Sequence, residues 1–154
     1  MAAGKRLAGP GPHPTQTRPM HTHPIEASLE AVARHLGDPT AQVYARLFDR
    51  EPALRALFVR DTDGSVRGQM LQQVIETVLD LAGDDRYASV LIGTEWVNHQ
   101  NLGVPGEQFS LFFTAMIETF RAELGEAWTP EFDAAWQAVM SRVTQIVAAH
   151  AASA

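Results

Sequence analysis

The chain has 154 residues, no cysteine, a formal net charge of −6 and 45% hydrophobic residues, which suits one soluble globular unit with a single buried core. The missing cysteines exclude disulfides, thiolate metal ligands and cysteine nucleophiles, and a single lysine, Lys5, in an acidic chain argues against nucleic acid as a partner. No apolar run reaches the roughly 20 residues of a membrane span, and no apolar secretory segment follows the first basic residues, so we expect a cytoplasmic protein.

The first part of the chain is rich in residues that resist regular structure. Residues 1–24 include five prolines and three glycines and show no helical or strand periodicity, which predicts a disordered tail followed by one domain over residues 25–150. His13, His21 and His23 lie in this tail, where short histidine-bearing segments hold metals only weakly.

From Ile25 onward the apolar residues recur at a spacing near 3.6, which predicts helices. The first runs to Leu36. Asp38 and Pro39 are typical of the N-cap and first residue of a second helix, and Pro52 starts a short third one.

The remaining elements follow the same spacing after a turn-rich loop, "RDTDGS". We expect a long helix over residues 66–82, a short one over 87–99, a long one opened by Pro105, and a last one capped by Thr129 and Pro130. No alternating apolar pattern indicates a strand, so the predicted fold class is all-α.

His99 is the main candidate for chemistry, because the chain has no phosphate-binding glycine loop, no GxSxG motif and no HExxH pair. Two interpretations of this histidine stay open. It is either a cation that caps the end of a helix ending at residue 98 or 99, or a ligand held among apolar neighbours such as Trp96 and Val104.

Three segments in order along the chain resemble a known family. "NHQNLGV" is similar to the segment around the haem-ligating histidine of single-domain bacterial haemoglobins and of the haemoglobin domain of flavohaemoglobins. "VYARLFDREPALRALF" resembles the second and third helices of those proteins, and "LGEAWTPEFDAAW" resembles the junction of their last two helices. The resemblance covers most of residues 25–147 and implies a three-over-three globin with eight helices, or seven if the segment after the third is irregular.

The resemblance implies roles for named residues. His99 is similar to the proximal ligand of haem b, and its second ring nitrogen needs an acceptor, for which the backbone carbonyl of Glu95 and the side chain of Asn98 are nearest in sequence. Phe58 matches the haem-stacking phenylalanine, and Tyr44 matches a distal tyrosine that donates to bound oxygen. Without the resemblance, Phe58 is equally compatible with an ordinary core aromatic, and Tyr44 is better explained as a buried tyrosine that bonds to a backbone carbonyl.

The helix over residues 66–82 would form the distal wall. Its apolar face turns Met70 and Val74 toward the haem, whereas a shift of one residue would present Gln69 and Gln73. We favour the first register, because burying two glutamines while exposing two aliphatic residues costs several kcal/mol, and Met70 is also a conceivable sixth iron ligand. The expected haem contacts are completed by three residues: Val104, Phe112 and Met140.

Two positions depart from the flavohaemoglobin pattern. The tyrosine and glutamate that strengthen the proximal histidine in that family correspond to Phe109 and about Ala151 here, which implies a more neutral proximal ligand. No reductase segment follows the predicted globin domain, so catalytic turnover would need an external reductase.

Three functions remain open at this stage. The favoured one is reversible binding of a diatomic gas (oxygen, nitric oxide or carbon monoxide) for transport, storage or sensing. The second is a nitric oxide dioxygenase that uses a separate reductase. The third is a haem-free regulatory module, which the joint presence of His99 and Phe58 disfavours.

Overall fold

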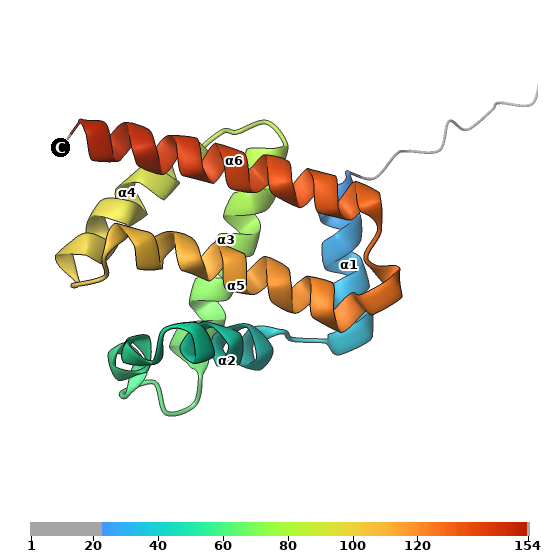
Figure 1. Cartoon of the computed structure of the whole chain (residues 1–154), viewed down its shortest axis with the longest axis horizontal. Coiled ribbons are helices and arrows are strands. Elements are labelled where there is room, and N and C mark those ends of the chain that lie inside the picture. Colours follow the sequence, from blue (N-terminus) through green and yellow to red (C-terminus); the bar gives the residue numbers. More distant parts are fainter. Residues whose placement is uncertain (1–22, 154) are drawn as a thin grey trace, which may run out of the picture.

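A computed structural model describes residues 23–153 of the chain (Figure 1). These residues form six α-helices and two short 3-10 helices and contain no strand, which confirms the predicted all-α class. Within this range no helix is both long and apolar enough to cross a membrane. In chain order the elements are α1 (Pro24–Leu36), α2 (Thr40–Arg50), η1 (Pro52–Phe58), α3 (Ser65–Ala82), α4 (Ala88–Asn101), α5 (Gly106–Leu124), η2 (Gly125–Ala127) and α6 (Pro130–Ala152).

The tail expected over residues 1–24 falls almost wholly outside the described residues, so that prediction stays untested. Of its histidines only His23 is described. Its Nδ1 accepts a hydrogen bond of 3.1 Å from the backbone N–H of Ile25 and so caps α1, which begins at Pro24.

The helices form two crossed layers. Figure 1 shows α2, α5 and α6 running across the view, with α1, α3 and α4 crossing them steeply. Within the first layer α5 contacts both α2 and α6, and between the layers α6 packs against α1 and α4 while α3 contacts α2. This arrangement agrees with the three-over-three sandwich that the sequence predicted.

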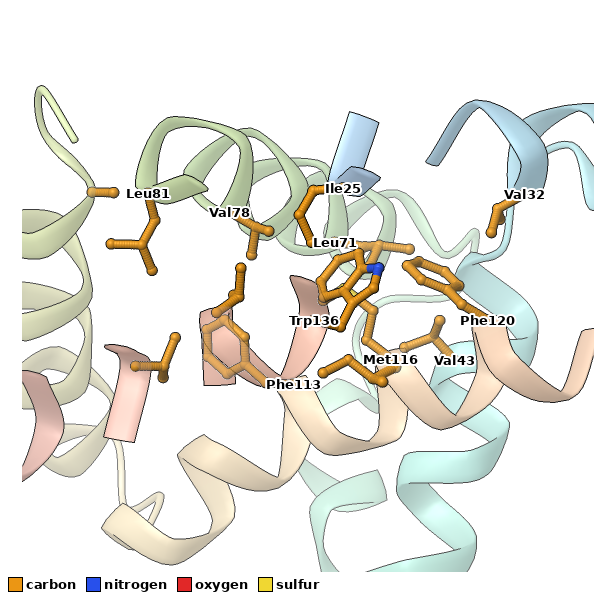
Figure 2. Packing of buried hydrophobic residues seen from close by; sticks show 14 of the residues in the cluster. Ile25, Val32, Val43, Leu71, Val78, Leu81, Phe113, Met116, Phe120 and Trp136 are labelled. Atoms are coloured by element: carbon orange, nitrogen blue, oxygen red, sulfur yellow. The ribbon is translucent and has the colours of Figure 1, made fainter. Parts of the chain in front are cut away.

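The main core lies where α1, α3, α5 and α6 meet (Figure 2). Trp136 is fully buried at its centre, and its indole N–H donates a 2.9 Å hydrogen bond to Ser28 Oγ, which in turn donates to the carbonyl of Ile25. Burial of apolar side chains drives this packing, and the Trp136–Ser28 pair joins the first and last helices without leaving a polar atom unpaired.

Several helix boundaries in the structure differ from the predicted ones. The predicted N-cap of α2 is one residue off: the helix begins at Thr40 and its N-cap is Pro39, while Oδ1 of Asp38, one position earlier, accepts from the backbone N–H of Thr40 at 2.9 Å. The expected end of α4 at residue 98 or 99 is wrong, because the helix continues to Asn101. The segment from Pro52 is a 3-10 helix, and η2 was not foreseen.

One carboxylate fixes the start of α4. Asp80, near the end of α3, accepts hydrogen bonds from the backbone N–H groups of Arg86, Tyr87 and Ala88 at 2.8 to 3.1 Å. Burial raises the pKa of this carboxyl, but the three backbone hydrogen bonds outweigh it and hold the pKa below its usual value. Asp80 thus caps the N–H of Ala88, the first residue of α4, and fixes the two residues that precede the helix.

The other side of α4 rests on the last helix at a close approach. A Cβ added to Gly93 would lie 2.1 Å from Nε2 of His150, so only glycine lets this imidazole lie against the helix. The Nδ1–H of His150 donates to the carbonyl of Ile146 at 2.9 Å, which fixes the ring on α6. Contacts from α3 and α6 therefore hold α4 in place.

Candidate functional site

His99 lies in the last turn of α4, and one of its ring nitrogens is already used. Nδ1 donates to the backbone carbonyl of Glu95 at 2.7 Å, because a carbonyl oxygen can only accept. This is the first of the two acceptors that the sequence suggested; Asn98 bonds to the Glu95 side chain instead. The hydrogen bond fixes the tautomer, so Nε2 carries the free lone pair.

Backbone hydrogen bonds form a tight turn directly after α4. The backbone N–H of Leu102 donates to the carbonyls of Asn98 and His99 at 3.1 Å, and that of Val104 donates to the carbonyl of His99 at 2.9 Å. Gly103 allows this reversal because its φ of +84° is strained for any residue with a Cβ. This geometry explains why the helix stops shortly after the histidine and the chain turns into α5.

Phe109, in the first turns of α5, packs edge-on against the imidazole. The two ring centroids lie 5.3 Å apart at an interplanar angle of 63°. Together with the hydrogen bond to Glu95, this contact restricts rotation of the His99 ring about its χ angles.

Tyr44, on α2, is buried among aromatic rings. Its ring lies 5.3 Å from that of Phe58 and 5.5 Å from that of Phe112, both in edge-on geometry, and the residue is 2% exposed. The Tyr44 hydroxyl has no hydrogen-bond partner among the described residues, which is unusual for a buried polar group.

Burial raises the pKa of the Tyr44 hydroxyl above its usual value, and the charge of Asp61 adds to this while that of Arg67 opposes it. The hydroxyl is therefore neutral at physiological pH and keeps a proton to donate.

A cavity of about 540 Å³ opens between α2, η1, α3, α4 and α5, within the usual range for small-molecule sites. Both His99 and Tyr44 line it, so two residues 55 positions apart in sequence face one space. The lining is mostly apolar and consists of Tyr44, Leu47, Leu54, Leu57, Phe58, Arg60, Asp61, Val66, Met70, Gln73, Val74, Thr77, Leu91, Ile92, Glu95, His99, Leu102, Val104, Gln108, Phe109, Phe112 and Phe113.

The cavity brings together seven of the eight site residues that the sequence predicted: Tyr44, Phe58, Met70, Val74, His99, Val104 and Phe112. Met140 is not among the lining residues. It packs against the main apolar core from α6, which accounts for its helical spacing without a role in the site.

Helix α3 turns the face with Met70 and Val74 toward the cavity. Met70 and Val74 both line it and Gln69 does not, in agreement with the register that the apolar pattern favoured. Gln73 also lines the cavity, but it is exposed and lies where the cavity opens to solvent. Thr77, one turn further on, donates its hydroxyl to the carbonyl of Gln73 at 2.6 Å.

Large apolar side chains surround the mouth of the cavity. Leu57 and Val66 on one side are about half exposed, at 52% and 49%, and Leu102 on the α4 side is 72% exposed. Apolar side chains on both sides of an open pocket are typical of a site that an apolar ligand covers.

A nearly buried ion pair lies beside this mouth, and the sequence reading missed it. Asp61 accepts from the backbone N–H groups of Val66 and Arg67 at 3.1 and 3.0 Å, and from Nε of Arg67 at 3.0 Å. Burial raises the pKa of Asp61, but these hydrogen bonds and the guanidinium outweigh it, so the pKa stays below its usual value. Asp61 thereby fixes the first turn of α3, and the turn-rich sequence "RDTDGS" was the available signal.

No group of three or more histidine, aspartate or glutamate side chains within residues 23–153 is arranged to hold a metal ion. His99 is thus a single potential ligand rather than part of a protein-only metal site.

Comparison with known proteins agrees with the all-α fold. A family model described as Globin matches residues 41–147, which run from the second residue of α2 to Val147 in α6. The chain belongs to the globin family. Two relatives of this globin, both named anaerobic nitrite reductase NSHB5, come from Oryza sativa subsp. indica and subsp. japonica. Each is 26% identical to this globin over 98 residues, which span 61% of the chain and 68% of the relative. No solved structure matches the globin significantly.

Proposed function

We propose that this globin binds haem b and, through it, reversibly binds a diatomic gas: oxygen, nitric oxide or carbon monoxide. The observation that carries the proposal is the pairing of two groups in one apolar cavity, namely His99 with its Nε2 unbonded and Tyr44 with an unpartnered buried hydroxyl. Within the family we further propose a relationship to single-domain bacterial haemoglobins and flavohaemoglobin domains, on the strength of the segments around His99, Tyr44 and Phe58.

The residues of the cavity fit this cofactor. A porphyrin is a flat, largely apolar group, and the apolar lining together with the exposed rim residues Leu57, Val66 and Leu102 would lose contact with water when it binds. In our proposal His99 provides the metal ligand, and Phe58 and Val104 hold the ring plane. When bound, the haem would supply an iron to which small gases can bind.

In this proposal Tyr44 supplies the polar group on the side of the haem away from His99. The apolar side chains of Met70, Val74 and Phe112 surround it there. Because the Tyr44 hydroxyl is neutral and has no partner among residues 23–153, it is free to donate a hydrogen bond to a polar diatomic ligand. The apolar neighbours exclude water, which would otherwise compete for that donor.

An absorption spectrum of purified protein loaded with haem tests the proposal in its ferric, ferrous and carbon-monoxide-bound states. We expect a haem band that shifts on addition of carbon monoxide, and we expect His99→Ala to lose most of the retained haem on gel filtration. The matched control is His35→Ala, which removes an exposed imidazole on α1 and should retain haem like the wild type. Absence of a haem band in the wild type, or equal retention in both variants, would contradict the proposal; the first result favours a haem-free regulatory module.

A second candidate function is chemistry on nitrogen oxides, supported by the name of the two Oryza sativa relatives. Nitrite reduction to nitric oxide consumes one electron and two protons and releases water, and nitric oxide dioxygenation also needs electrons for repeated turnover. Either activity would require a separate reductase. Mixing the reduced, haem-loaded protein with nitrite, and the oxygenated protein with nitric oxide, distinguishes these activities from simple gas binding by the products formed.

A further inference from the structure

A carboxylate lies one helical turn before the candidate haem ligand. Oε2 of Glu95 is 3.7 Å from Nδ1 of His99, while the backbone carbonyl of the same residue accepts the Nδ1–H at 2.7 Å. A single residue therefore presents both a hydrogen-bond acceptor and a negative charge to the same N–H group. The i, i+4 spacing on α4 produces this arrangement.

The Glu95 side chain is held in this position. Nδ2 of Asn98 donates to Oε1 of Glu95 at 3.4 Å, and the glutamate side chain is 33% exposed where it lines the cavity. No arginine or lysine among the described residues forms an ion pair with Glu95, so no fixed cation neutralises its charge.

The other charged residues of the lining, Arg60 and Asp61, lie in the loop between η1 and α3. Neither of them forms a hydrogen bond or an ion pair with His99, whereas Glu95 lies on the same helix one turn before it. Glu95 is thus the carboxylate of the lining that lies beside the imidazole.

A negative charge beside the N–H of an imidazole polarises that bond and raises the electron density on the other ring nitrogen. An imidazole with more electron density donates more strongly to a metal and stabilises its higher oxidation state. The sequence implied a neutral proximal ligand, because Phe109 and about Ala151 replace the tyrosine and glutamate of flavohaemoglobins. The position of Glu95 offers an alternative source of negative charge, from the ligand's own helix.

We propose that Glu95 is a positioning residue for the proximal ligand: its carboxylate strengthens donation from His99 and lowers the reduction potential of the bound haem. This inference rests on the proposed function. It adds to that function a specific group, on α4, that sets the electronic character of the site.

The test compares the full-length haem-loaded wild type with Glu95→Gln, which keeps the backbone carbonyl and the shape of the side chain and removes only the charge. Resonance Raman spectra of the ferrous protein report the iron–histidine stretching band, and potentiometry reports the midpoint potential. We expect Glu95→Gln to shift the stretching band to lower frequency and the potential to a higher value. Glu95→Asp, which keeps the charge, should lie nearer the wild type in both measurements.

The matched control is Glu126→Gln. It removes one exposed carboxylate from η2, which follows the end of α5 that lies away from α4. It should leave both readouts unchanged (Figure 1). Asn98→Ala gives a second, independent variant that frees the carboxylate without altering Glu95, and we expect smaller shifts in the same direction.

The outcomes separate this inference from the function it rests on. A wild type that binds haem through histidine, with Glu95→Gln identical to it in both readouts, overturns the role of Glu95 alone. Equal shifts in Glu95→Gln and Glu126→Gln also overturn it, since they indicate a general charge effect. A wild type without a haem band overturns both proposals.

Discussion

Two buried aromatic residues with a polar hydrogen, Trp136 and Tyr44, differ in how that hydrogen is used. The indole N–H of Trp136 donates to Ser28 in a region filled by side chains from α1, α3, α5 and α6. The hydroxyl of Tyr44 has no hydrogen-bond partner in the described part of the chain, and the residue lines a cavity of about 540 Å³. Both residues are almost completely buried.

The difference shows that the same helical layers form two kinds of interior. Around Trp136, close packing and paired polar groups stabilise the fold. Around Tyr44, an open volume and an unpaired donor cost stability, as is common where a ligand completes a site. Substitutions around Trp136 should therefore mainly lower stability, and substitutions around Tyr44 should mainly change ligand binding.

Truncation of the packed region should have the largest effect. Trp136→Ala removes a fully buried indole and leaves Ser28 Oγ with one partner fewer, so we expect the free energy of unfolding to fall by about 3 to 5 kcal/mol. Urea unfolding followed by circular dichroism measures this change. Leu102→Ala, at the exposed rim of the cavity, is the control and should change the value by less than about 0.5 kcal/mol. A similar loss in both variants would remove the contrast between the regions.

Removal of the α4 cap should have a smaller effect that depends on pH. Because the folded pKa of Asp80 is depressed, its contribution is fully present above the unfolded value of about 3.9 and is lost as the pH falls through the folded value. Asp80→Asn should therefore be less stable than the wild type at pH 7, and the difference should shrink below about pH 4. Thermal unfolding at a series of pH values measures it.

The control for Asp80 is Asp84→Asn, which breaks only an exposed ion pair with Arg86 in the same loop and should leave stability nearly unchanged. A difference between Asp80→Asn and the wild type that did not vary with pH would show that the carboxylate charge is not what holds the start of α4.

Tyr44→Phe should have the smallest effect on stability and a clear effect on binding. Its hydroxyl forms no hydrogen bond within residues 23–153, so its removal should leave the free energy of unfolding of the haem-free protein unchanged or raise it by up to about 1 kcal/mol. In the haem-loaded protein, loss of one hydrogen bond worth about 1 to 1.5 kcal/mol should speed oxygen dissociation roughly five- to tenfold. Flash photolysis or stopped-flow mixing measures that rate.

Tyr87→Phe is the matched control for Tyr44→Phe, since the Tyr87 hydroxyl donates to the carbonyl of Glu76 and the residue is half exposed. It should alter neither the oxygen dissociation rate nor haem retention. An unchanged dissociation rate in Tyr44→Phe would mean that the unpaired hydroxyl serves no ligand.

The helices were predictable from the sequence because local patterns determine them. Apolar spacing located each of the six α-helices, and Thr129 caps α6 as expected, with its Oγ accepting from the backbone N–H of Phe132 at 3.1 Å. The helix boundaries were less predictable where a side chain forms hydrogen bonds across a loop. Asp80 bonds to the first residue of a helix that begins eight positions later, and no local sequence pattern shows how the loop between them folds back.

The candidate site was predictable where the argument concerned one helix face. Apolar spacing placed Met70 and Val74 toward the cavity, and the i−4 relation identified the carbonyl of Glu95 as a partner of His99. The same reasoning could not distinguish Met140 from a lining residue, because a side chain that packs in the core has the same apolar character as one that lines a cavity. It also gave no rotamer for Glu95, so the proximity of its carboxylate to the imidazole became visible only in three dimensions.

The uncovered leucine and valine side chains at the cavity mouth have a consequence for how the protein is made. Leu57, Val66 and Leu102 stay in contact with water until something seats against them, and such surfaces also attract one another between copies. In a newly synthesised chain, binding of the proposed haem therefore competes with self-association. We expect expression without added porphyrin to yield aggregated protein, and expression with porphyrin to yield monodisperse protein.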